Sequence, residues 1–277
     1  MIFKILGAGV MLAARLCLAA GDVVPVEMAP LHGIGKGGKS TQRPYILVMA
    51  TFTTEKTSSI GWVALDTGTP HPLPMVLASE AFAKRLSQGK MGDVTMAIGP
   101  ASWKGVGLLP FPVLAIEDIN RDYRKELGAT PAVGVVSNYF LSQYLLTVDY
   151  PNHQVYFRPL DAVRRTFYET KPLADVPYRN EGGAIRIPIT LNHKIQGEAY
   201  VDTGTPFSWV DPAKITKPLT SWLIGDYEAT PHVRRPPWKV PIQPGTIAHL
   251  GNDVLGSAVL TIDPREKRLY LESPREP

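Results

Sequence analysis

Asp66-Thr67-Gly68-Thr69 and Asp202-Thr203-Gly204-Thr205 are the same four residues, and a proline follows each copy. Each copy also ends an apolar, strand-like run, Gly61–Leu65 in the first case and Glu198–Val201 in the second. A carboxylate on a tight turn beside a buried strand costs free energy, because the charge is partly withdrawn from water. The repetition suggests that the two carboxylates are meant to lie together.

A second set of repeated blocks follows each loop, and all three blocks are displaced by the same 114 positions. Asn138–Leu141, Thr147–Asp149 and Val155–Phe157 recur as Asn252–Leu255, Thr261–Asp263 and Leu269–Leu271. The Asp loops themselves are 136 positions apart, so the second copy has 22 fewer residues (136 less 114) between its loop and its closing blocks. Two copies of so long a period do not make a solenoid. They predict two similar halves that face each other.

The paired loops resemble those of the aspartic proteases, in which two Asp-Thr/Ser-Gly loops share one water between their acids. The resemblance covers roughly Tyr45 to Leu271, and the short halves are closer to fused retropepsin-like units than to pepsin. It implies a mainly β fold with two similar lobes of the acid-protease type facing across a substrate cleft. Val135–Asn138 and His249–Asn252 look like the family's hydrophobic-hydrophobic-Gly segments, with Ser137 where glycine is usual.

Asp66 and Asp202 are the candidate catalytic pair. Two carboxyl groups about 3 Å apart do not both ionise easily, so the pair holds a single proton. The ionised member can take a proton from a bridging water while the protonated member donates to the substrate carbonyl. This predicts an aspartic endopeptidase that needs no covalent intermediate. The alternative is a non-catalytic protein that binds a peptide or a cell-envelope partner between the same two lobes.

The other loop residues have expected supporting roles. Gly68 and Gly204 lack a Cβ, so their backbone can turn sharply and approach the carboxylates. Hydroxyl donors beside a carboxylate favour its ionised form, which predicts activity at acidic to mildly acidic pH. By resemblance, Thr67 and Thr203 would bond across the interface between the lobes, and Thr69 and Thr205 could donate to the outer carboxylate oxygens.

A flap over the substrate is expected in the hairpin around Met91–Leu109, with Trp103 near its tip. An ordinary surface hairpin explains the same pattern equally well. Val94–Ile98 and Val106–Ala115 flank Gly99-Pro100, which predicts the turn at those two residues. Elsewhere, alternation predicts strands at Tyr45–Met49, Ile60–Leu65, Ile185–Leu191 and from Ile195 to Asp202, and Ser79–Gln88 has the pattern of a short helix.

The domain plan follows from composition along the chain. Residues 1–20 read as a signal peptide and 21–43, rich in Gly, Pro and Lys, as a flexible lead-in. The N-terminal lobe is expected over 44–160, the connection over 161–182 and the C-terminal lobe over 183–277. The one cysteine of the 277 residues, Cys17, lies in the signal, so no disulfide is expected in the mature chain. The protein is expected in the periplasm or medium of a bacterium, with tethering by an uncleaved signal as the alternative.

Other classes of function are disfavoured. A net charge of +4, scattered along the chain, gives no reason to expect nucleic-acid binding. Gly33–Ser40 matches a phosphate-binding loop letter for letter, but Pro44 and the β-like residues beyond it leave no helix to hold a nucleotide. The six histidines lack metal-site spacing. The expected partner is therefore a peptide or protein substrate, with no metal or other cofactor, bound by a monomer whose lobes pair within the chain.

Overall fold

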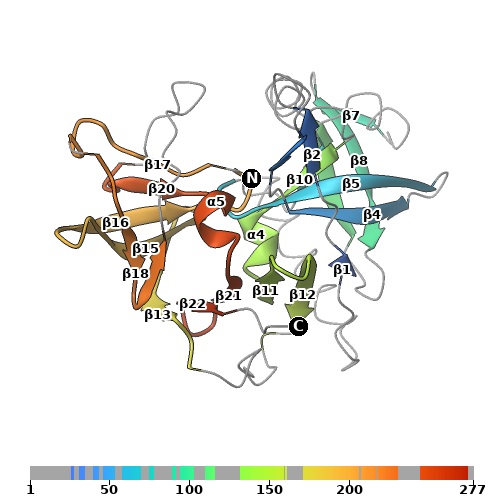
Figure 1. Cartoon of the computed structure of the whole chain (residues 1–277). Helices are drawn as coiled ribbons and strands as arrows, with labels where there is room; N and C mark the ends of the chain where they lie inside the picture. Colours follow the sequence, from blue (N-terminus) through green and yellow to red (C-terminus); the bar gives the residue numbers. More distant parts are fainter. Residues whose placement is uncertain are drawn as a thin grey trace.

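The computed structural model describes a large part of the chain. The described residues are 26–27, 31–34, 40–43, 46–53, 58–69, 75–77, 89–91, 94–102, 110–115, 132–158, 160, 171–205, 207–216, 218–229 and 244–273. Over these ranges the protein is mainly β, with two four-residue helices, α4 (Asn138–Leu141) and α5 (Asn252–Leu255). One large sheet is built from each half of the sequence, and a third sheet combines strands of both halves (Figure 1).

The sheet of the N-terminal half has the strand order β4-β5-β10-β6-β9-β8-β7. Its central strand β5 pairs antiparallel with β4 and parallel with β10, so it is held on both sides. Val48, Val63 and Leu65 are fully buried, since apolar residues fill the inner face. The strands are β4 (Leu47–Thr53), β5 (Ser58–Asp66), β6 (Met75–Leu77), β7 (Gly89–Met91), β8 (Val94–Ser102), β9 (Pro110–Ala115) and β10 (Ala132–Ser137).

The sheet of the C-terminal half repeats the central part of this arrangement. Its order is β17-β20-β16-β15-β18-β19, with β14 also paired to β15. Strand β16 pairs antiparallel with β15 and parallel with β20, as β5 does with β4 and β10. The strands are β14 (Arg179–Glu181), β15 (Ala184–Leu191), β16 (Ile195–Val201), β17 (Trp209–Val210), β18 (Trp222–Ile224), β19 (Tyr227–Ala229) and β20 (Ala248–Leu250).

The third sheet joins the two halves and has the order β1-β12-β11-β21-β22-β13. At its centre Thr147 pairs with Thr261, its own counterpart in the repeat, and their hydroxyl oxygens lie 2.9 Å apart. Equivalent residues that pair with each other mark the position of an approximate twofold axis. The strands are β1 (Val26–Glu27), β11 (Leu145–Asp149), β12 (Gln154–Arg158), β13 (Ala174–Pro177), β21 (Val259–Asp263) and β22 (Arg268–Glu272).

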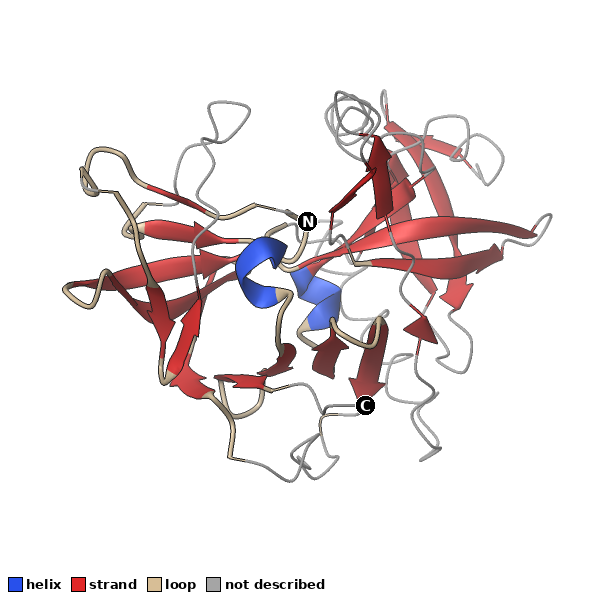
Figure 2. Ribbon diagram, in the orientation of Figure 1, coloured by secondary structure: helices blue, strands red, loops and turns tan. Residues whose placement is uncertain are grey.

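The two helices occupy equivalent places, because α4 directly follows β10 and α5 follows β20 after one residue. They lie next to each other near the middle of the molecule (Figure 2). Phe140 and Leu141 of α4 and Val254 and Leu255 of α5 are buried in the hydrophobic core, which runs through both halves. The core thus ties each repeated helix to the shared sheet beneath it.

Most of the strands expected around the two loops are confirmed. The strands predicted at Ile60–Leu65, Ile185–Leu191 and from Ile195 onward are β5, β15 and β16, and the one predicted at Tyr45–Met49 is β4, shifted toward Thr53. The predicted turn at Gly99-Pro100 is wrong. Strand β8 continues through both residues to Ser102 and pairs Pro100 with Pro110 of β9, so the chain does not turn at Gly99-Pro100.

Two segments expected to be irregular contain strands. In the lead-in over 21–43, β1 pairs with β12, and a hairpin joins β2 (Leu31–Ile34) to β3 (Ser40–Arg43). In the connection over 161–182, β13 and β14 form, and β13 covers the edge of β22. Main-chain pairing to a ready sheet edge needs no hydrophobic periodicity in the added strand, so the composition gave no sign of it.

Several other expectations lie outside the described residues. These are the signal peptide at 1–20, the helix at Ser79–Gln88, and Trp103 with the flap tip. Within the described part of the chain, no helix is long and apolar enough to cross a membrane.

Candidate active site

The two aspartates occupy equivalent places at the ends of the central strands. Asp66 is the last residue of β5 and is buried, and Asp202 directly follows β16. Parallel pairing with β10 and β20 continues to the ends of these strands, which places Ser137 opposite Asp66 and Leu250 opposite Val201. Each loop therefore leaves the sheet at a point that two neighbouring strands hold.

Thr67 and Thr203 join the two loops by a reciprocal set of hydrogen bonds. The backbone N–H of Thr67 donates to Oγ1 of Thr203 at 3.1 Å, and the N–H of Thr203 donates to Oγ1 of Thr67 at 3.1 Å. Each hydroxyl then donates across the interface, from Thr67 to the Val201 carbonyl at 3.1 Å and from Thr203 to the Leu65 carbonyl at 2.8 Å. The bond between the loops expected for these threonines is thus present, and both are fully enclosed.

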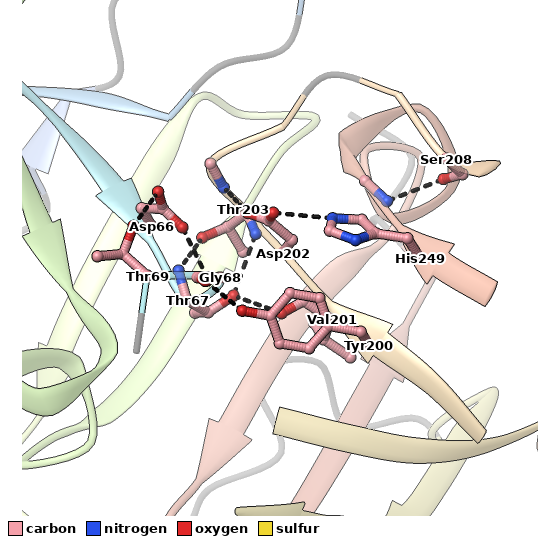
Figure 3. A network of polar contacts seen from close by, with 12 residues as sticks. Asp66, Thr67, Gly68, Thr69, Tyr200, Val201, Asp202, Thr203, Ser208 and His249 are labelled. Carbon is pink, nitrogen blue, oxygen red and sulfur yellow. Dashed lines mark hydrogen bonds and ion pairs between the residues drawn. The ribbon is translucent and has the colours of Figure 1, made fainter. Parts of the chain in front are cut away.

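Each glycine lies against the carboxylate of the opposite loop. A Cβ added to Gly68 would stand 2.2 Å from Cγ of Asp202, and one added to Gly204 would stand 2.2 Å from Cγ of Asp66. No side chain can occupy such a space, so glycine is required at both positions for close approach. This reciprocal packing of each glycine on the opposite carboxylate also brings the two carboxyl groups together at the interface between the loops (Figure 3).

Hydrogen-bond donors surround Asp66 from within its own loop. The N–H of Gly68 donates to Oδ1 at 2.7 Å, and the hydroxyl of Thr69 donates to Oδ2 at 2.6 Å. Both contacts favour the ionised carboxylate. The expected role of Thr69 as a donor to the outer oxygen therefore matches its position.

Asp202 has a different second partner. The N–H of Gly204 donates to Oδ1 at 2.8 Å, as in the first loop. Its Oδ2, however, lies 2.8 Å from Nε2 of His249 (Figure 3). Among the described contacts, Thr205 makes no hydrogen bond to this carboxylate, so the expectation for Thr205 is wrong. A histidine from β20 occupies the place that the Thr69 hydroxyl takes in the other half.

Aromatic rings hold His249 in position. Its imidazole stacks on Trp209 of β17, with ring centroids 3.6 Å apart and planes at 17°. Tyr200 of β16 meets it edge-on at 4.9 Å. The Tyr200 hydroxyl donates to the Gly68 carbonyl, which adds another bond between the loops. Sequence reasoning missed both Tyr200 and His249.

The signal that could have revealed them is the internal repeat. In the first half, the residue two positions before Asp66 is Ala64 of β5, and its parallel partner on β10 is Val135. In the second half, the equivalent partners on β16 and β20 are Tyr200 and His249. Two apolar residues in one copy thus correspond to an aromatic phenol and an imidazole in the other. Such a change beside a candidate dyad indicates a function for the polar pair.

Burial shifts the pKa values of this group. It raises the pKa of Asp202 from its ordinary 3.8 to about 6, although hydrogen bonds from Asp66 and from the Gly204 amide act in the opposite direction. Burial lowers the pKa of His249 from 6.5 to about 3, and the charge of Asp66 partly opposes that change. The imidazole is therefore neutral over the range in which Asp202 titrates.

The segments after β10 and β20 support the loops from below. The N–H of Asn138 donates to the Thr69 carbonyl at 3.3 Å, and the N–H of Asn252 donates to the Thr205 carbonyl at 2.9 Å. Gly251 has no room for a Cβ, which would meet the Phe207 carbonyl oxygen at 2.3 Å. The serine at the equivalent position, Ser137, is fully buried, so the first half accommodates a side chain there.

The remaining candidate, Trp103, lies outside the described residues. Within the part of the chain that is described, no three His, Cys, Asp or Glu side chains gather as a metal site would require. The Gly33–Ser40 segment begins within β2, which ends at Ile34, and its last residue, Ser40, is the first residue of β3. A phosphate-binding loop would place a helix there.

Comparison with known proteins adds no relative to this geometry: neither a scan against protein-family models nor a search of curated proteins found a match for the chain.

Proposed function

We propose that the protein is an aspartic endopeptidase whose two halves are lobes of the acid-protease type, with Asp66 and Asp202 as the catalytic pair. The observation that carries this proposal is the set of reciprocal contacts between the two Asp-Thr-Gly-Thr loops. Each glycine packs on the other loop's carboxylate, and each threonine bonds the other loop's backbone. Two acids in such contact share a proton, which is the property that the chemistry needs.

The chemistry assigns a role to each group. The ionised carboxylate takes a proton from a water held between the two acids, and the water oxygen then bonds the peptide carbonyl carbon. The protonated carboxyl donates to the carbonyl oxygen, so that no isolated charge develops there. The carboxyl that took the proton of the water then donates it to the nitrogen, and the carbon–nitrogen bond breaks. The other carboxylate takes a proton from a hydroxyl of the diol as the new carbonyl forms, so the dyad returns to its starting state. The substrate is a peptide or protein, and no cofactor takes part.

Cleavage of a mixed peptide library between pH 3 and 7 tests this function. We expect the wild type to cleave, and Asp66→Asn and Asp202→Asn each to lose activity by at least about 10²–10⁴-fold, because neither carboxyl works alone. Asn keeps the shape of the side chain, so folding should be preserved. Asp226→Asn is the matched control, since Asp226 lies on the surface in an exposed pair with Lys171.

Several outcomes would contradict the proposal. Full activity in either dyad variant would show that another group performs the hydrolysis. Peptide binding without turnover in all proteins would favour the non-catalytic alternative, a binder that uses the same residues. A statine-type inhibitor gives an independent criterion, because a transition-state mimic should bind the wild type much more tightly than a substrate peptide does.

A further inference from the structure

The two members of the candidate dyad have different partners, although their loops are equivalent. Asp66 receives the hydroxyl of Thr69, whereas Asp202 contacts the imidazole of His249. His249 stands where the first half has Val135, so nothing in the shared backbone plan requires a histidine there. The imidazole therefore occurs in one half only, where it contacts Asp202, a member of the candidate dyad.

Burial and aromatic packing fix the position of His249. The side chains of His249 and Asp202 are only 5% and 14% exposed. Trp209 covers one face of the ring, and Tyr200 meets its edge. A ring packed between two aromatic side chains cannot turn away, so Nε2 stays directed at the carboxylate.

We propose that His249 is a positioning residue that holds Asp202 as the ionised, water-activating member of the dyad and leaves the shared proton on Asp66. This inference rests on the proposed function, because it divides the work of the same two acids. It also goes beyond it, since two equivalent loops alone would not decide which acid is the base.

The argument depends on the different chemistry of a hydroxyl and an imidazole. The Thr69 hydroxyl donates to Asp66 in this geometry, but a hydroxyl can rotate and accept instead, so it can adjust to a protonated Asp66. A neutral imidazole with its hydrogen on Nε2 can only donate at that nitrogen. With the Gly204 N–H on the other oxygen, Asp202 then has a donor on each oxygen, and both favour its ionised form.

The other titratable groups belong to the Asp66 loop, to strands of the same sheet as β20, and to the segment that follows β20. Asp66 lies across the interface between the loops and opposes the loss of the imidazole proton. Tyr200 on β16 is neutral, because burial raises the pKa of its phenol. On β15, Arg186 pairs with Tyr200 in register, and its guanidinium is 3.2 Å from Glu181. Trp209 of β17 has no titratable group. Beyond β20, Asp253 accepts a hydrogen bond from Ser208.

Nitrogen-15 NMR of the histidine side chains tests the inference without any requirement for activity. The resonance of His249 is identified by its absence in His249→Gln. We expect the neutral ring with hydrogen on Nε2 between pH 5 and 7, and a changed Nε2 shift in Asp202→Asn. A ring with hydrogen on Nδ1, or a ring that is protonated throughout this range, would overturn the proposal.

The pH profile of kcat/KM for peptide cleavage provides the second test. In His249→Val, which introduces the residue of the first half, Asp202 loses its donor, and the acidic limb should move up by about one to two pH units. In His249→Gln an amide N–H can replace the lost donor, so the limb should move by less than about half of that. A purely structural role would lower kcat/KM equally at all pH values and leave the limb in place, which would overturn the proposal.

Failure of the proposed function gives a different result from failure of this inference. If no preparation cleaves peptides, the endopeptidase proposal fails and the NMR experiment still decides the state of His249. If the wild type cleaves and His249→Val has an unmoved acidic limb, the endopeptidase proposal stands and the role of His249 is refuted.

Discussion

The two halves of the molecule share a backbone plan and differ in the side chains that meet the aspartates. The central strands, the Asp-Thr-Gly-Thr loops and the short helices are equivalent, whereas Ala64 and Val135 in one half correspond to Tyr200 and His249 in the other. The glycine and threonine contacts across the interface are shared by both halves. The bond from the Tyr200 hydroxyl to the Gly68 carbonyl and the contact between His249 and Asp202 have no counterpart among the described residues of the first half. Only the shared set brings the carboxylates together, so only that set must be symmetric.

The largest effect is expected from alanine at the two glycines. In Gly68→Ala or Gly204→Ala, the new methyl would stand 2.2 Å from the opposite Cγ, and the carboxyl groups must separate. Misplacement by about 1 Å can cost about 10²-fold in rate, so each variant should lose at least that in kcat/KM. Cleavage assays on both variants test the symmetry. A loss in one variant only would show that the halves are not equivalent at the interface.

Loss of the threonine hydroxyls should weaken the protein next most strongly. Thr67→Val and Thr203→Val each remove a group that both donates and accepts across the interface, leaving buried backbone groups unsatisfied. We expect each to lower the free energy of unfolding by about 2–4 kcal/mol. Urea denaturation measures it, with Thr67→Ser and Thr203→Ser as controls that keep the hydroxyl. The double variant should be less destabilised than the sum, because the two hydroxyls act on one network.

The pH dependence of the free energy of unfolding should distinguish the contribution of Asp202 from that of His249. The pKa of Asp202 is raised to about 6, so its contribution to stability falls as the pH rises from about 4 to 6, where the unfolded chain ionises first. The pKa of His249 is lowered to about 3, so its contribution rises between about pH 3 and 6.5, where only the unfolded chain takes up the proton.

These two contributions oppose each other, each with a slope of at most about 1.4 kcal/mol per pH unit. The wild type should therefore show a flatter profile than either variant. Stability should fall with pH in His249→Gln and rise with pH in Asp202→Asn over pH 4–6, as measured by urea unfolding in a series of buffers. Profiles of the same sign in both variants would contradict the opposed contributions.

The smallest effect is expected from the fourth residue of each loop, and here the halves should differ. Thr69→Val removes a 2.6 Å donor to Asp66 and should cost about 1–2 kcal/mol in the free energy of unfolding near neutral pH. Thr205→Val removes no bond to Asp202, so its change should stay within about 0.5 kcal/mol. Thermal or urea denaturation of the pair decides this. Equal losses would mean that Thr205 does bond its carboxylate in solution.

The local pattern of the sequence was enough to predict the strands that carry the loops. Strands β5, β15 and β16 follow from alternating apolar residues, and the glycine and threonine positions follow from the repeated motif. Strands β1 and β13 could not be predicted in this way, because an added edge strand is held by main-chain bonds to a sheet assembled from distant residues. The turn at Gly99-Pro100 failed because pairing with β9 extends β8 beyond a local turn signal.

By itself the sequence determined the duplication, the two acids and the residues that must be small or hydroxylated beside them, since these depend on residue identity and spacing. Only the tertiary structure decided which groups contact each acid. Thr69 and Thr205 are identical by sequence, yet one bonds its carboxylate while His249 takes that place in the other half. Position 249 is 47 residues from Asp202 along the chain. It reaches the carboxylate because parallel pairing of β16 with β20 places it beside Tyr200, two residues before Asp202.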